Sequence, residues 1–262
     1  MTPDVTPCAP HPFAQTDVVQ DHQAAVASPL RDGLEVPHGR LIAVISVEEG
    51  EIDRWHVFQR CLEGLVEQTL ARMVEFADAG ERRGGGGPVQ VPALAIADVC
   101  AGSGCIAIAL ARWLPAATIT AIDVSPDALA VAGRNALRHD VAGRVVLLKG
   151  DLLEGVDGPF DAIVSNPPYV PTGELDSLQP EVRDHEPAAA LDGGPDGLDV
   201  IRRLVPQAAR RLRAGGWLLF ELGFGQADAV RAVVAAEPGF EAAELCADLA
   251  GIPRVAIARR RR

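Results

Sequence analysis

The sequence lacks an apolar run long enough to cross a membrane. Its longest apolar stretches lie around Leu94–Val99 and Cys105–Leu114, well short of the ~20 residues that a bilayer requires. The N-terminus also lacks the early positive charge of a signal peptide, because Asp4 stands in that region and the first Lys or Arg is Arg31. We therefore expect a cytoplasmic protein with no membrane contact.

Positive charge is scarce. The 262 residues include 24 Lys and Arg against 36 Asp and Glu, a formal net charge of −12, and Lys149 is the one lysine. Nucleic-acid-binding surfaces neutralise phosphates with basic patches. The four C-terminal arginines, Arg259–Arg262, are expected to form a short solvated tail. The charge therefore predicts no stable nucleic-acid binding.

Cysteines are too few and too irregularly spaced for a disulfide framework or a structural zinc site. The five are Cys8, Cys61, Cys100, Cys105 and Cys246, an odd number with no C-x-x-C pair. We expect reduced, mostly buried thiols and no metal. With 48% apolar and 23% charged residues, the chain has the composition of an ordinary globular protein.

The chain divides into three regions by composition. Residues 1–50 are rich in proline without a hydrophobic period, which predicts an extended or partly disordered arm. Residues 51–87 carry an amphipathic helix from about Asp53 to Ala77 and then the flexible Gly84–Gly87 linker. Residues 88–262 form the main domain.

In the main domain, strand-like apolar stretches alternate with helical periods, which predicts a doubly wound α/β fold. The expected strands are Ala93–Val99, Thr118–Asp123, Val145–Leu148, Asp161–Ser165, Trp217–Glu221 and Val255–Ala258, and the expected helices are Cys105–Leu114, one opened by Ser125-Pro126-Asp127, Leu198–Leu212 and Gln226–Ala236. The third and fourth strands are continuously apolar, as in a parallel sheet buried on both faces. Ser125 suits a helix N-cap, and Gly215-Gly216 is a helix stop signal.

A glycine-rich turn follows the first strand of this domain and opens a helix. In an open α/β sheet, ligands bind at the carboxyl ends of the strands. Gly102 and Gly104 allow a sharp turn and close approach to a ligand. The third glycine of G-x-G-x-x-G is absent, since Ala107 stands there, and this motif alone leaves a dinucleotide open.

Acidic residues follow the next two strands. Asp123 lies about twenty residues beyond the glycine turn, the spacing of a ribose-binding acid, although a helix-capping or surface role is the alternative. Asp151 can accept from an adenine amine while Leu152 packs on the ring, or it is an ordinary loop acid. Together they suit an adenosine ligand without phosphates, and a sulfonium cation beside Asp98 is favoured.

The most specific motif is Asn166-Pro167-Pro168-Tyr169, directly after the fourth strand. Two consecutive prolines lack N–H donors, so the local carbonyls remain available as acceptors. If the Asn166 side-chain oxygen and the Pro167 carbonyl accept both hydrogens of an amide or amine, its nitrogen lone pair is oriented for attack. Tyr169, the one tyrosine of the chain, can stack on the planar group. The alternative is a plain Pro-Pro turn.

From about Ala93 onward, these motifs resemble the bacterial glutamine methyltransferases that modify peptide chain release factors, which are class I S-adenosylmethionine-dependent enzymes. The resemblance rests on Asp98–Ile106, Asp123, Ser165–Tyr169, Val182–Pro187, Ala190–Leu198, and Glu221–Gly223 with Gln226. Many methyltransferases share the Asn-Pro-Pro-Tyr turn, but the Glu-Pro, Leu-Asp-Gly-Gly and Asp-Gly-Leu run is typical of this family. The resemblance covers about two-thirds of the chain.

The resemblance implies a mostly parallel, seven-stranded class I methyltransferase sheet that binds S-adenosylmethionine. The cofactor would contact Asp98, Cys100, Ala101, Gly102, Ser103, Gly104, Asp123, Asp151, Leu152 and Asn166. Asn166, Pro167, Pro168 and Tyr169 would hold the amide of a glutamine in the Gly-Gly-Gln loop of a peptide chain release factor. Direct methyl transfer needs no metal, and we expect a monomer.

The N-terminal region departs from the family pattern. Members carry a small helical domain, which helps dock the release factor, and a hairpin ending in Pro-Arg-Pro-Glu-Thr-Glu. This chain has Gln59–Gly64 in the matching register, where only Arg60 agrees, and Cys100 replaces the usual first glycine of the turn. Two alternatives therefore stay open: a methyltransferase acting on an exocyclic amine of a nucleic-acid base, and a cofactor-binding relative without activity.

Overall fold

The structure is a computed structural model that describes residues 64–73, 93–248 and 250–262. Residues 64–73 are helical and fall inside the helix expected from about Asp53 to Ala77. The arm predicted for residues 1–50 and the Gly84–Gly87 linker lie outside the described residues. None of the helices in these ranges has the length and apolar character needed to cross a bilayer.

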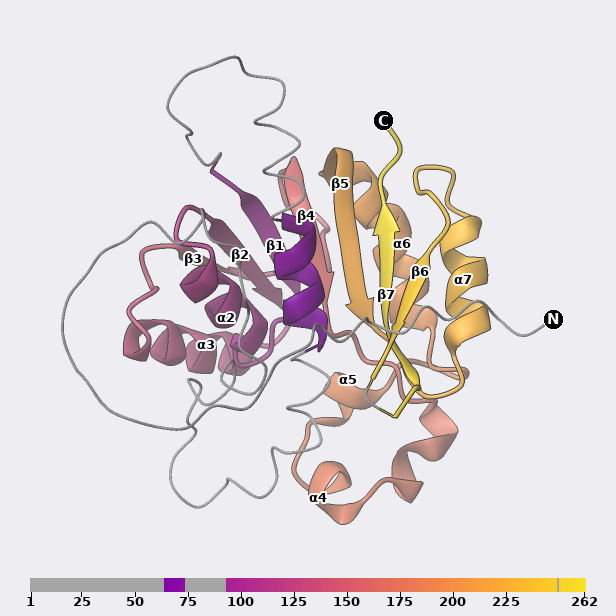
Figure 1. The fold of residues 1–262 in the computed structure, drawn as a ribbon. Helices are drawn as coiled ribbons and strands as arrows, with labels where there is room; N and C mark the ends of the chain where they lie inside the picture. Colours follow the sequence, from indigo (N-terminus) through magenta and orange to yellow (C-terminus); the bar gives the residue numbers. More distant parts are fainter. Residues whose placement is uncertain (1–63, 74–92, 249) are drawn as a thin grey trace, which may run out of the picture.

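The described domain is built on a seven-stranded sheet with the order β3-β2-β1-β4-β5-β7-β6 (Figure 1). The strands are β1 Ala95–Val99, β2 Thr118–Asp123, β3 Val145–Lys149, β4 Phe160–Ser165, β5 Leu212–Glu221, β6 Glu244–Ala247 and β7 Pro253–Arg259. The first five are parallel, whereas β7 runs antiparallel to both β5 and β6. The predicted doubly wound, mostly parallel α/β fold is confirmed.

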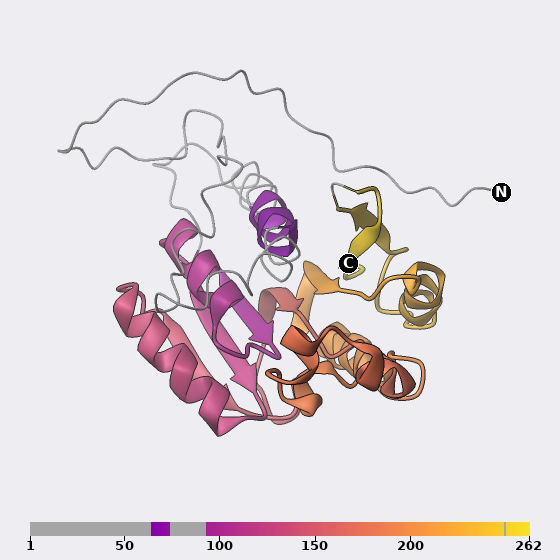
Figure 2. The ribbon, with the colours of Figure 1, turned by 90° about the horizontal axis from the view of Figure 1, so that it is seen from below.

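Helices cover both faces of the sheet (Figure 2). They are α2 Cys105–Trp113, α3 Pro126–Arg138, α6 Asp199–Arg211 and α7 Ala227–Ala235, with shorter η2 Thr172–Ser177, α4 Pro180–Arg183 and α5 Ala188–Leu191. One buried cluster joins residues 64–73 and α2 to the sheet, and the other joins α6 and α7 to its opposite face. Ser125 caps α3 as predicted, because its hydroxyl accepts from the Ala128 N–H at 3.2 Å.

The prediction that Gly215-Gly216 ends a helix was wrong. Helix α6 ends at Arg211, and β5 begins at Leu212, a buried residue that pairs in register with Phe160 of the neighbouring strand β4. Both glycines therefore lie within β5. Gly215 has a φ of +80°, and its N–H donates to the Arg260 carbonyl at 3.0 Å. The glycine pair lies at an irregular part of β5, where the pairing with β4 shifts in register. Pairing with neighbouring strands therefore determines the conformation here, and the local glycine signal does not.

Two further predictions need correction. Strand β3 was expected to be buried on both faces, but it lies at the sheet edge with only Val145 buried. The C-terminal arginines were expected to be a solvated tail, but Arg259 belongs to β7 and lies 5.1 Å from the centre of the Trp217 ring. The Arg260 guanidinium donates to the Leu212 carbonyl. Backbone pairing with β5 draws these residues into the domain.

Candidate active site

The carboxyl ends of the parallel strands bring the predicted site segments to one edge of the sheet. Val99 at the end of β1 pairs in register with Ser165 at the end of β4, and Ser165 pairs with Phe220 near the end of β5. The Ser165 hydroxyl donates to the Val99 carbonyl at 2.7 Å. The residue before the glycine-rich turn is thus bonded to the residue before the Asn166–Tyr169 turn. The two turns predicted to be functional leave the sheet side by side.

Asp98 is a buried carboxyl group at the start of the glycine-rich turn. Its Oδ2 accepts from the Ala107 N–H at 2.9 Å, while its Oδ1 has no hydrogen-bond partner among the described residues. Burial raises the pKa of Asp98 to about 7, the Ala107 bond opposes that rise, and the negative charge of Asp123 adds to it. A buried, unpaired carboxylate oxygen is costly without a ligand, so this atom is a candidate contact for a cationic or N–H-bearing group.

Asp123, at the end of β2, ties the turn to the neighbouring strand. Its Oδ2 accepts from the Gly102 N–H and its Oδ1 from the Ser125 N–H, at 2.8 and 2.9 Å. Asp123 is not a helix cap, because Ser125 is the N-cap of α3 and Asp123 accepts from the N–H of that residue. Each carboxylate oxygen can accept more than one hydrogen bond, so Asp123 keeps acceptor capacity for ribose hydroxyls.

The loop after β3 also reaches this edge. The Gly150 N–H donates to the Asp123 carbonyl at 3.0 Å, which places Asp151 next in the chain. Asp151 forms an ion pair with Arg203 of α6 at 2.6 Å, a contact that no sequence motif predicted. Leu152 has a φ of +55° and is buried. Any ligand contact by Asp151 would have to share its carboxylate with Arg203.

Cys100 occupies a backbone conformation that suits glycine. Its φ is +59°, a region that costs an L-residue about 1–2 kcal/mol. Burial raises the pKa of its thiol to about 12, so the thiol is protonated at neutral pH and is not a nucleophile. Within the described ranges, no group of three or more His, Cys, Asp or Glu side chains could hold a metal ion.

We expect Cys100→Gly to fold with a free energy of unfolding within about 1 kcal/mol of the wild type. The relief of left-handed strain offsets the lost side-chain packing and the greater freedom of the unfolded chain. Cys100→Val should destabilise by about 2 kcal/mol or more, because a β-branched residue tolerates this conformation poorly. Urea denaturation of both variants checks this, and equal stabilities would contradict it.

The Asn166–Tyr169 turn leaves β4 directly. Asn166 is half-buried and Pro167 is buried. The Tyr169 hydroxyl donates to Oε1 of Glu221, a buried residue at the end of β5, at 2.8 Å. Because neither proline has an N–H, the turn offers carbonyl oxygens without competing donors. The structure therefore presents an acceptor-lined turn, anchored at its tyrosine, next to the glycine-rich turn.

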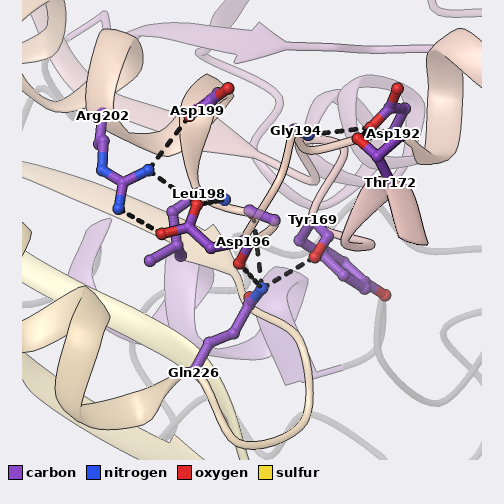
Figure 3. A network of polar contacts seen from close by, with 10 residues as sticks. Tyr169, Thr172, Asp192, Gly194, Asp196, Leu198, Asp199, Arg202 and Gln226 are labelled. Atoms are coloured by element: carbon purple, nitrogen blue, oxygen red, sulfur yellow. Dashed lines mark hydrogen bonds and ion pairs between the residues drawn. The ribbon is translucent and has the colours of Figure 1, made fainter. Parts of the chain in front are cut away.

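A polar network holds this turn against the loop 192–198 (Figure 3). The Asp192 Oδ1 accepts from the Thr172 hydroxyl and the Gly194 N–H, at 2.7 and 2.9 Å, and these bonds hold the pKa of Asp192 below its usual value. Asp196 pairs with Arg202 at 2.5 Å. The Gln226 Nε2 donates to the Tyr169 carbonyl at 2.8 Å. Glu221 and Gln226 were part of the family resemblance, but their bonds to Tyr169 were not predicted.

Known proteins share the fold described above. Residues 89–179 match the family model of the methyltransferase small domain. A methyltransferase from Pyrococcus furiosus has the same fold, with a TM-score of 0.50 at 16% identity over 74% of this chain and 99% of that one. The described domain therefore has the class I methyltransferase fold.

Two relatives at higher identity carry the same name. A release factor glutamine methyltransferase of Geobacter sulfurreducens is 56% identical over 139 residues, which are 53% of this chain and 48% of that protein. One from Thermodesulfovibrio yellowstonii is 38% identical over 194 residues, 74% of this chain and 64% of that protein. These matches confirm the resemblance predicted from the sequence. The chain spans between about half and two-thirds of the length of these relatives.

Proposed function

We propose that this chain methylates the side-chain amide nitrogen of a glutamine, in the Gly-Gly-Gln loop of a peptide chain release factor, in the cytoplasm. One observation carries the proposal: the Ser165–Val99 hydrogen bond at 2.7 Å joins the acceptor turn to the glycine-rich turn. A methyl donor held by one turn and an amide held by the other would then be neighbours. The names of the relatives supply the choice of glutamine and release factor.

The glycine-rich turn fits S-adenosylmethionine. The unpaired Oδ1 of Asp98 suits a cationic or N–H-bearing group, and a Cβ built on Gly102 would have no atom within 4 Å, so there is open space at this turn. Asp98, Cys100–Gly104, Asp123, Asp151, Leu152 and Asn166 would hold the cofactor. When bound, it supplies a methyl group on a positively charged sulfur.

The protein's own part in the reaction is to position and stabilise the acceptor. The Asn166 side-chain oxygen and the Pro167 carbonyl would accept the two amide hydrogens and stabilise the positive charge that develops on nitrogen. The Tyr169 ring would stack on the amide plane. Holding both reactants in place contributes up to about 7–11 kcal/mol to lowering the barrier, and the proton can leave to water without a dedicated base.

Cofactor affinity should depend on pH through Asp98. Its pKa of about 7 in the free protein should fall when a cation lies beside it, so binding releases a proton below that pH. We expect the dissociation constant of S-adenosylmethionine to decrease as pH rises toward about 7 and to level off above it. Calorimetry should show weaker, pH-independent binding for Asp98→Asn. A constant affinity between about pH 6 and 8 in the wild type would contradict this role.

The function is tested by incubating the protein with S-adenosylmethionine and a release factor and locating any added methyl group by mass spectrometry. One methyl on the glutamine of the Gly-Gly-Gln loop is the expected result. Parallel reactions with RNA and DNA test the exocyclic-amine alternative, and cofactor binding without turnover on any acceptor would support a relative that has lost activity. A release factor variant with Asn in place of that glutamine is the matched control.

A further inference from the structure

The side chain of Gln226, between β5 and α7, is buried and uses both ends of its amide. Its Nε2 donates to the Tyr169 carbonyl at 2.8 Å and lies 3.4 Å from the Gly197 carbonyl. Its Oε1 accepts from the Gly223 N–H at 2.8 Å. One side chain therefore joins the acceptor turn to the loop 192–198 (Figure 3), and it also binds the backbone just after β5.

The backbone packs tightly around the Gln226 amide. A Cβ on Gly197 would lie 2.3 Å from the Tyr169 carbonyl oxygen and 2.4 Å from the Gln226 Nε2. A Cβ on Gly223 would lie 2.9 Å from the Gln226 Oε1 and 3.2 Å from the Tyr169 ring. Two glycines thus let the backbone close around Gln226, and the position of the Tyr169 carbonyl follows from that packing.

Tyr169 is held at both ends as a result. Gln226 binds its carbonyl, and Glu221 accepts from its hydroxyl at 2.8 Å. The Tyr169 carbonyl lies only three residues beyond Asn166, and the intervening prolines restrict the backbone. A displacement at Tyr169 is therefore transmitted to Asn166.

We infer that Gln226 is a positioning residue, which sets the geometry of the Asn166–Tyr169 turn through the Tyr169 carbonyl without touching the substrate. The identity of the acceptor amide rests on the proposed function, but the hydrogen-bond role of Gln226 does not. Gln226→Glu separates the two ends of the amide. An ionised Glu keeps an acceptor for the Gly223 N–H and lacks the donor for Tyr169, whereas a protonated Glu regains that donor.

Tyr169 is the one tyrosine of the chain, so 3-fluorotyrosine labelling gives one ¹⁹F resonance that reports on it directly. We expect Gln226→Glu to shift this resonance at about pH 7.5. Near pH 6 the resonance should return toward its wild-type position, because a buried carboxyl group that faces carbonyl oxygens has a raised pKa and becomes protonated. Val234→Ala, which shortens a buried side chain in α7, the helix that follows Gln226, is the control and should leave the resonance in place.

Methylation kinetics are measured on the same variants. With saturating cofactor, Gln226→Glu should lower kcat about 30-fold or more relative to the wild type at about pH 7.5 and should recover part of that loss near pH 6. Its cofactor affinity should stay within about threefold of the wild type's at the same pH. If this variant does not fold, Gln226→Met should show the shift and the loss without pH recovery. An unchanged resonance, or a kcat equal to that of Val234→Ala, would overturn the role of Gln226. A wild type that methylates no release factor would instead overturn the proposed function.

Discussion

Asn166→Ala should lower kcat/KM for the protein acceptor by about 100- to 1,000-fold while changing the dissociation constant of S-adenosylmethionine by less than about threefold. The substitution removes an acceptor whose interaction strengthens as positive charge develops on the acceptor nitrogen, and losing one such interaction typically costs this much in rate. The remaining cofactor contacts come from other strand ends. Steady-state methylation kinetics and calorimetric titration of the cofactor provide the two measurements.

The chain offers a matched asparagine for this experiment. The Asn135 Nδ2 donates to the Ser103 carbonyl in the glycine-rich turn at 3.0 Å, so Asn135→Ala should weaken the cofactor more than it affects the transfer step. Opposite patterns in the two variants would separate donor binding from acceptor activation. If Asn166→Ala lost cofactor affinity and activity in equal proportion, Asn166 would contact the cofactor without accepting the amide hydrogens.

Gly197→Ala should destabilise the protein by about 2–4 kcal/mol and lower activity more than 100-fold. The φ of +76° is unfavourable for alanine, and the new Cβ would lie 2.3 Å from the Tyr169 carbonyl oxygen, so the backbone of the acceptor turn must move. Urea denaturation gives the loss of stability. Methylation kinetics of the folded fraction give the effect on the turn.

Gly155→Ala is the control for backbone strain alone. Gly155 has a φ of +70°, and a Cβ at this position would have no atom within 4 Å. Alanine at position 155 would therefore have a strained backbone conformation without a steric clash. We expect a loss of about 1 kcal/mol and normal activity. Equal effects of the two substitutions would show that the contact between Gly197 and Tyr169 does not determine the geometry of the turn.

The sequence predicted local structure well where the signal was local. Strand β2 has the bounds expected for Thr118–Asp123, and Ser125 caps the helix that follows. Both depend on nearest neighbours and periodicity. The glycine pair at Gly215 and the edge strand β3 were misjudged because their environment is set by residues distant in the sequence.

The candidate site shows the same division. The spacing of the glycine turn, Asp123 and Asn166–Tyr169 was sufficient to place them at one edge, because parallel strands of a doubly wound sheet end together. The bond between Gln226 and the Tyr169 carbonyl spans 57 residues, and that between Arg203 and Asp151 spans 52. No periodicity or spacing rule predicts contacts across such separations.

By itself, then, the order of residues determined the alternation of strands and helices and the chemistry available at each strand end, since both are encoded within a few neighbouring positions. Only the tertiary structure decided which buried oxygen of Asp98 stays unpaired and which side chain holds the tyrosine of the acceptor turn. Those outcomes depend on how separate segments pack and exclude water, and such packing is a property of the whole domain.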